Sequence, residues 1–179
     1  ESAQEMFEYT SSNNLEVEYL VNNAWFGDHG EFIESNLERN SQMISLNILS
    51  LTRLCRLYGE SMRKNKFWRI INVASTAAFQ PGPYMAVYFA TKSYVLNFSL
   101  ALATELKEYG VTVTALCPGP TESNFQSNAH ATWIAIFKWK LPTSQEVAEF
   151  GYKHMNQWTL IAIHGFMNRI KAFSVKFLP

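Results

Sequence analysis

The sequence predicts an α/β fold in which helices cover both faces of a parallel sheet. Two observations carry this prediction: apolar runs of strand length, WRIINVAS at 68–75 and VTVTALCPG at 111–119, and long stretches of helical periodicity between them. Near-continuous apolar runs are typical of strands buried on both faces, and strands that alternate with helices build parallel sheets. Right-handed crossovers then bring the carboxyl ends of the strands to one edge, where such sheets bind ligands.

Two helices and two strands are expected in the first half of the chain. Apolar residues at helical spacing predict a helix near residues 3–10, which the polar run 11–14 ends. Segment 15–21 carries apolar residues into an Asn-rich turn and is expected to be a strand. A broad apolar stripe predicts a long helix over 37–63, which precedes the strand at 68–75.

The second half repeats the alternation. The elements expected after the Pro-Gly-Pro turn at 81–83 are a helix over 84–108, a strand over 111–117, a helix over 144–155, a strand over 159–165 and a terminal helix over 165–179. Tyr109-Gly110 is expected to end the first of these helices. Thr143 or Ser144 can cap the second, with Glu146 in its first turn.

The composition indicates one globular domain over residues 1–179. Hydrophobic residues make up 47% and charged residues 17%, and 15 basic residues balance 15 acidic ones. We therefore expect neither nucleic acid nor a membrane as a partner, and no apolar run reaches the roughly 18 residues of a membrane span. Cys55 and Cys117 are expected to be reduced and buried in a cytosolic protein, and the four histidines show no metal-site spacing.

The segment YFATK places Tyr88 and Lys92 four residues apart, on one face of the predicted helix. This spacing alone does not distinguish a packing pair from a proton donor beside a cation. Ser75 follows a buried strand and is expected at the same edge of the sheet, while Asn47 interrupts an apolar stripe in mid-helix. Each has an ordinary alternative, because serine caps helices, tyrosine packs and asparagine bonds locally.

Further residues are expected at that edge, since they follow the predicted strands at 15–21 and 111–117. These residues are Asn22-Asn23-Ala24 and Pro118-Gly119. With Ser75, Tyr-x-x-x-Lys and the mid-helix Asn, they resemble the motifs of the short-chain dehydrogenase/reductase family, in order and at family spacing. The similarity covers nearly all 179 residues. It implies a partial Rossmann-type doubly wound sheet, the 4-5-6-7 half of the family strand order 3-2-1-4-5-6-7.

The resemblance implies NAD(P)(H)-dependent carbonyl reduction or alcohol oxidation, and it gives catalytic roles to Ser75, Tyr88, Lys92 and Asn47. Tyr88 would move the proton, Ser75 would hold the substrate oxygen, and Asn47 would hold a water that links Lys92 to solvent. An unperturbed tyrosine, with a pKa of about 10, is a poor base near neutrality. We therefore expect Lys92, as a cation within about 4–6 Å, to lower the pKa of Tyr88.

NADP or NAD is the implied cofactor. The residues that the resemblance assigns to its nicotinamide end are Asn22, Asn23, Ala24, Tyr88, Lys92, Pro118 and Gly119. The family's Gly-rich phosphate-binding turn is not present, because the first glycine is Gly27 and the strand at 15–21 matches the family's fourth. We expect that strand to be an exposed edge, and the preference between NAD and NADP is not readable.

Two tryptophans depart from the family pattern. Trp25 stands where the family has a glycine that lets the backbone pass close to the cofactor, and Trp68 occupies a turn position where relatives usually carry glycine. The indole of Trp25 could block the cofactor. It could instead fill space left by the absent half of the sheet.

Segment 120–142 sits where the family places its substrate lid. Its aromatic residues Phe125, Trp133 and Phe137 could line a pocket for an apolar carbonyl compound or alcohol, or could simply pack on the core. The C-terminal helix at 165–179 is expected to serve oligomer packing rather than a membrane surface.

Two functions compete. The first is an oxidoreductase whose activity is impaired in this chain, and the intact set of Ser75, Tyr88, Lys92 and Asn47 favours it. The second is a catalytically silent domain that acts only as an association module, which Trp25 and the absent Gly-rich turn favour. The resemblance also implies a homo-oligomer that forms through the helices at 37–63 and 84–108.

Overall fold

The computed structural model describes residues 2–65, 68–123, 129 and 141–174. Its strands are β1 (Tyr19–Asn22), β2 (Trp68–Val73), β3 (Val111–Cys117) and β4 (Ile161–Ile163), in the order β1-β2-β3-β4. All neighbouring pairs are parallel, with Leu20 opposite Ile70, Ile71 opposite Thr114 and Leu116 opposite Ala162. The predicted parallel α/β sheet is therefore confirmed.

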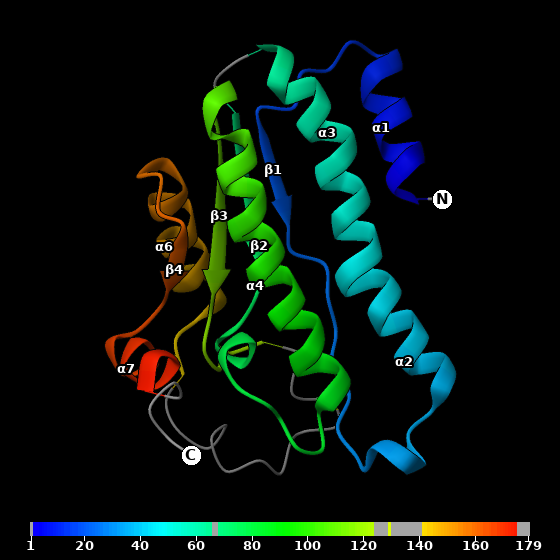
Figure 1. Cartoon of the computed structure of the whole chain (residues 1–179), viewed down its shortest axis with the longest axis vertical. Helices are drawn as coiled ribbons and strands as arrows, with labels where there is room; N and C mark the ends of the chain where they lie inside the picture. Colours follow the sequence, from blue (N-terminus) through cyan, green and yellow to red (C-terminus); the bar gives the residue numbers. More distant parts are fainter. Residues whose placement is uncertain (1, 66–67, 124–128, 130–140, 175–179) are drawn as a thin grey trace.

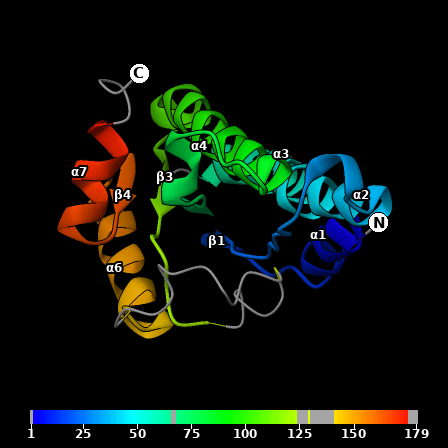
Figure 2. The same cartoon turned by 90° about the horizontal axis from the view of Figure 1, so that it is seen from below.

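Helices cover both faces of this sheet (Figures 1 and 2). Helices α2 (Leu37–Ile44), α3 (Leu51–Asn65) and α4 (Ala86–Leu106) lie on one face, and α6 (Ser144–Asn156) lies on the other. The remaining α-helices are α1 (Ser2–Ser12), which packs on α3, and α7 (Phe166–Ser174) at the carboxyl edge. Short 3-10 turns form η1 (Phe32–Glu34), η3 (Thr76–Phe79) and η4 (Lys107–Tyr109).

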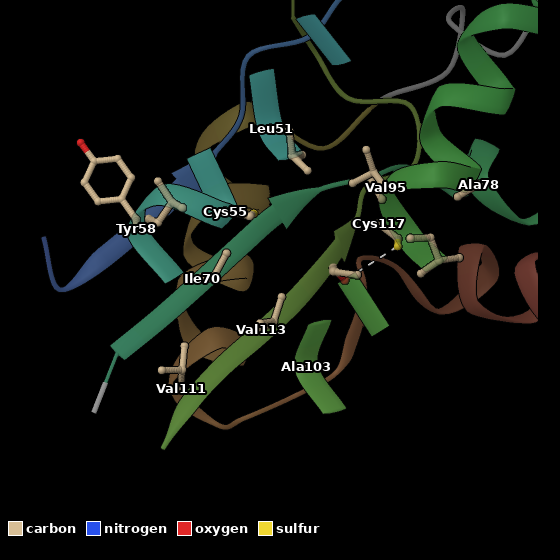
Figure 3. Packing of buried hydrophobic residues seen from close by; sticks show 14 of the residues in the cluster. Leu51, Cys55, Tyr58, Ile70, Ala78, Val95, Ala103, Val111, Val113 and Cys117 are labelled. Atoms are coloured by element: carbon tan, nitrogen blue, oxygen red, sulfur yellow. Dashed lines mark hydrogen bonds between the residues drawn. The ribbon is translucent and has the colours of Figure 1, made fainter. Parts of the chain in front are cut away.

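The alternation of side chains along β2 divides the core into two layers. Ile70 belongs to the larger cluster under α3 and α4, where Figure 3 shows Leu51, Cys55 and Val95 packed above the sheet. Ile71 and Val73 belong to the cluster under α6. Successive side chains of a strand point to opposite faces, so a run that is apolar at nearly every position supplies both layers.

Three predicted boundaries change. The helix expected over 37–63 is continuous in direction but contains a π-helical segment, η2 (Ser45–Ser50), which carries Asn47. The strand expected over 15–21 forms only at Tyr19–Asn22, because it pairs on one side alone, with Arg69 to Asn72 of β2. The strand expected over 159–165 likewise shortens to β4.

Two helix ends have the caps that the sequence predicts. Thr143 accepts a hydrogen bond from the Glu146 N–H, and the Glu146 carboxylate accepts one from the Thr143 N–H, which completes a capping box. Gly110 ends η4 in the left-handed conformation, with φ of 73°. Of the helices in the described residues, none is long and apolar enough to cross a bilayer.

In the part of the chain that the structure describes, β1 is an edge strand of the sheet, as the sequence predicts, and β4 is the other edge strand. Val21 of β1 is 57% exposed on the face of the sheet that it shares with Ile71, whereas the neighbouring β2 is buried along its whole length. An unpaired strand edge with an apolar side chain on it is a surface that can pair with another strand.

Candidate functional site

The predicted residues meet at the carboxyl edge of the sheet. Ser75 follows β2, Pro118 and Gly119 follow β3, and the N-terminal half of α4 brings Tyr88 and Lys92 alongside them. Tyr88 and Lys92 are both buried on the face of α4 that packs against the sheet and η3. The parallel topology therefore places these residues together although they come from three different segments.

Ser75 is in contact with Tyr88 and is held by the backbone around it. Its hydroxyl shares a hydrogen bond with the Tyr88 phenol. The Ser75 Oγ also accepts from the Ala77 N–H at 3.1 Å, which caps η3, and donates to the Pro118 carbonyl at 3.4 Å. Ser75 can thus cap η3 and interact with the Tyr88 phenol in the same conformation.

Lys92 is almost completely enclosed, with 1% of its surface exposed. Its Nζ donates to the Val73 carbonyl at 2.8 Å and lies 5.8 Å from the centre of the Tyr88 ring. Burial lowers the pKa of Lys92 well below its ordinary value, and the nearby Cys117 only partly opposes this. Burial raises the pKa of the Cys117 thiol to about 12, so that thiol stays protonated.

The indole of Trp25 also lies against Lys92. The Lys92 Nζ lies 4.1 Å from the centre of the Trp25 ring, a cation–π distance. The rings of Trp25 and Tyr88 are 6.1 Å apart at their centres. The side chain that departs from the family pattern is therefore packed on both the lysine and the tyrosine of the motif.

Asn47 ties the segment after β1 to the helices. Its Nδ2 donates to the Phe26 carbonyl at 2.9 Å and to the Thr91 Oγ1 at 3.0 Å, and its Oδ1 accepts from the Phe26 N–H at 3.1 Å. It does so from the π-helical segment η2, a feature that often marks functional positions. Thr91 was missed by sequence reasoning, although it lies three residues after Tyr88 on the buried face of α4.

The pKa of Tyr88 shifts in the direction opposite to that expected from the sequence. Burial raises it to about 12, and the hydrogen bond with Ser75 opposes this only in part. The reason is that an enclosed phenol loses the hydration that stabilises its phenolate. The same burial disfavours the charge on Lys92, so the expected lowering of the Tyr88 pKa is wrong for this closed arrangement.

Asn22, which the sequence assigns to the cofactor, faces the interior instead. Its Nδ2 donates to the Asn72 Oδ1 at 2.8 Å and lies 3.3 Å from the Cys55 sulfur. Asn72 in turn donates to the Ser99 Oγ at 2.9 Å. This buried chain joins β1, β2 and α4, and sequence reasoning missed both Asn72 and Ser99.

The other predicted cofactor residues lie at the surface or at the edge. Asn23 and Ala24 are exposed. A Cβ on Gly119 would come within 2.3 Å of the Asn168 amide, so glycine at 119 allows α7 to approach β3 closely. The Pro118 carbonyl accepts from the Thr76 N–H at 2.8 Å.

The proposed lid falls mostly outside the described residues. Phe125, Trp133 and Phe137, the aromatic residues expected to line a pocket, are not among them. Ala129 is described and is buried with Met43, Ala77, Met85 and Tyr88. Of the C-terminal helix expected over 165–179, the described part is α7, which ends at Ser174.

Comparison with known proteins identifies the family to which the sequence is similar. The family model for short chain dehydrogenases matches residues 1–133. The chain belongs to the short-chain dehydrogenase family. It is 33% identical over 121 residues to the 3-oxoacyl-[acyl-carrier-protein] reductase of Synechocystis, covering 68% of this chain and 49% of that protein. It is 37% identical over 120 residues to the 2-dehydro-3-deoxy-D-gluconate 5-dehydrogenase of Bacillus subtilis, covering 66% and 45%.

A solved relative of the short-chain dehydrogenases shares the fold. The short-chain dehydrogenase of Sphingobium yanoikuyae in complex with NADPH superposes with a TM-score of 0.81 at 24% identity, covering 97% of this chain and 68% of that one. The chain thus spans less than half the length of the two curated relatives above.

The site only partly suits the nicotinamide cofactor of the short-chain dehydrogenases. Lys92 has the right chemistry, since an ammonium donates hydrogen bonds to ribose hydroxyls. The indole of Trp25 lies 4.1 Å from that ammonium, and only 1% of the Lys92 surface is exposed. In this conformation the position beside Lys92 does not admit a further group.

Replacing Asn22 should destabilise the chain even though the sequence assigns it to the cofactor. Asn22→Ala leaves the buried Asn72 Oδ1 with only the weak Cys55 thiol as donor, at 3.6 Å, which we expect to lower the free energy of unfolding by about 1–3 kcal/mol. Urea denaturation measures this. Asn23→Ala, at the exposed neighbour, is the matched control and should change stability by less than about 0.5 kcal/mol. Equal effects of the two changes would contradict a structural role for Asn22.

The Tyr88 phenol should titrate near pH 12. Because its pKa is raised above the ordinary value of 10.0, it contributes stability that is complete below pH 10 and is lost as the pH rises towards 12. The measurement is the phenolate absorbance of the chain minus that of Tyr88→Phe, across the alkaline range. A difference signal that is complete below pH 10 would show that Lys92, not burial, governs this phenol.

Proposed function

We propose that this chain carries the catalytic centre of an NAD(P)(H)-dependent carbonyl reductase or alcohol dehydrogenase, with an activity that is impaired in these 179 residues. The observation that carries the proposal is the hydrogen bond between Ser75 and Tyr88, with Lys92 one helical turn further along the same face. The curated relatives support it, since their names describe a ketone reduction and a sugar-acid alcohol oxidation.

Each residue of the tetrad has a proposed role. Tyr88 exchanges a proton with the substrate oxygen, and Ser75 holds that oxygen by a hydrogen bond from its hydroxyl, which the cap of η3 already orients. Lys92, when charged, favours the phenolate of Tyr88. Asn47 fixes the Phe26 backbone and holds a water between Lys92 and solvent.

The cofactor is a proposal of the same kind. A neighbour solved with NADPH shares the fold, which supports a nicotinamide dinucleotide without fixing NAD or NADP. We assign its nicotinamide end to Asn23, Ala24, Pro118 and Gly119 beside Tyr88 and Lys92. We assign no cofactor contact to Asn22, which holds the end of β1 in place by its hydrogen bond to Asn72.

The test is reduction of a panel of apolar and polar carbonyl compounds by the purified chain with NADPH or NADH. Proton transfer by a positioned side chain typically contributes about 100-fold or more, so Tyr88→Phe should lower the rate by at least that factor. Tyr94→Phe is the control, because Tyr94 lies on the same helix but bonds to Thr52 on the outer face. An unchanged rate of reduction in Tyr88→Phe would refute the proposal. Failure of the wild-type chain to reduce any of the compounds would refute it too.

An association role has its own support. Helices α2, α3 and α4 lie side by side (Figure 1), and Leu37, Ile44, Leu49 and Tyr94 on this surface are exposed. The outer face of α4 also borders an open, largely apolar hollow of about 650 Å³ with Phe79, Pro83 and Phe89 in its wall. We propose that copies of this chain pair through these helices.

Charge placed on that surface should dissociate the pair. Ile44→Lys combined with Leu49→Lys is expected to convert a dimer into a monomer in sedimentation velocity, because two lysines per copy would be desolvated in the interface. Ile33→Lys, at an 88% exposed residue of η1 outside the three helices, is the control and should leave the dimer intact. A wild-type chain that is monomeric at every concentration would refute pairing.

A further inference from the structure

Trp25 connects two parts of the core that the sheet otherwise separates. Its side chain packs against the cluster of Met43, Ala77, Met85 and Tyr88 and also against the α6-side cluster that contains Val73. It reaches both because β1 ends at Asn22 and the following residues cross the carboxyl edge of the sheet. The indole is therefore placed over the site by packing on both sides, as well as by its contact with Lys92.

The backbone around Trp25 is anchored at both ends. Asn22 is fixed by its bond to Asn72, and Phe26 is held by Asn47 through both its N–H and its carbonyl. Only Asn23 and Ala24, which are exposed, separate the first anchor from Trp25. Movement of the indole thus requires rotation within a short segment and leaves the rest of the site in place.

The sequence leaves two explanations for Trp25: it blocks the cofactor, or it fills space left by the absent half of the sheet. The position of its ring distinguishes them. A side chain that filled the space on the uncovered face of β1 would cover Val21, yet Val21 remains 57% exposed. The indole instead lies on Lys92 and Tyr88. Its place is the catalytic edge and not the open side of the sheet.

We propose that Trp25 is a built-in occupant of the position beside Lys92, held there by the ammonium, and that a nicotinamide dinucleotide reaches Lys92 only after the indole has moved away. The identity of the displacing ligand rests on the proposed function, whereas the closure of Lys92 by Trp25 does not. The directions of the Lys92 and Tyr88 pKa shifts agree with a closed state, since both follow from burial.

Lys92 reactivity tests the closure without any cofactor. Acetylation of each lysine is followed by peptide mass spectrometry, with the exposed Lys153 as the internal reference. In the wild-type chain Lys92 should react at least about tenfold more slowly than Lys153, because reaction requires a minor open state. Trp25→Gly should remove most of that protection, and Trp158→Gly should not.

The Trp158 variant is a matched control for loss of an indole. Trp158 is 58% exposed and has φ of 61°, a left-handed conformation that glycine adopts without strain. If Trp25→Gly fails to fold, Trp25→Leu keeps apolar packing but loses the aromatic face and part of the volume, and Lys92 should still become more reactive. Rapid labelling of Lys92 in the wild-type chain would overturn the inference without any variant.

Cofactor titration gives the second readout. Nicotinamide fluorescence with NADPH and NADH should show affinity at least about tenfold higher for Trp25→Gly than for the wild-type chain, since the competent state is no longer a minor one. Equal affinity, with Lys92 equally protected in both, would overturn the inference and leave the proposed function standing. Exposure of Lys92 in the variant with no binding to either chain would support closure by Trp25 and refute the proposed function.

Discussion

Burial of the Lys92 ammonium is the constraint on which the site depends. A charge enclosed in an apolar interior is costly unless it is paired, and no carboxylate contacts this one among the described residues. It has instead the Val73 carbonyl, the π face of Trp25 and a thiol neighbour, Cys117. These partners compensate a cation only in part, which is why the pKa of Lys92 falls and why the phenol beside it gains little help in ionising. The position of Trp25 and the electrostatics of the tetrad are therefore linked, because the indole helps to bury the Lys92 ammonium.

The scaffold that holds this arrangement is a set of buried amides. Asn22, Asn72 and Ser99 link the edge strand to the centre of the sheet and to α4, and Asn47 links the following loop to η2 and α4. Buried polar groups that are hydrogen-bonded to one another fix a single geometry, because any displacement leaves a donor or acceptor unpaired. β1 keeps its place by these bonds although one of its sides is open. The same bonds set the path of the chain through residues 23–26, and with it the direction of the Trp25 side chain.

Membership in the short-chain dehydrogenase family and closure of the site are compatible. Ser75, Tyr88 and Lys92 lie together at the carboxyl edge of the sheet, and one of the departures from the family pattern, the indole of Trp25, lies on Lys92. A chain of this kind can retain the groups for proton transfer while the state that binds cofactor is a minority. The β1 edge and the apolar side chains of α2, η2 and α4 are exposed in either case.

The sequence by itself determined the parallel α/β fold, the order of its elements, an N-cap at Thr143 or Ser144, and the convergence of Ser75, Tyr88 and Lys92. These follow from local periodicity, from capping chemistry and from the rule that parallel strands share one carboxyl edge, all of which can be applied without knowing side-chain directions. Only the tertiary structure decided that Asn22 points to Asn72, that Asn47 binds Phe26 from a π-helical turn, and that Trp25 lies on Lys92. Those outcomes depend on contacts between residues about 20 to 70 positions apart, and the direction of the Tyr88 pKa depends on how much water they exclude. Spacing along a chain carries no information on either, because burial is a property of the packed molecule.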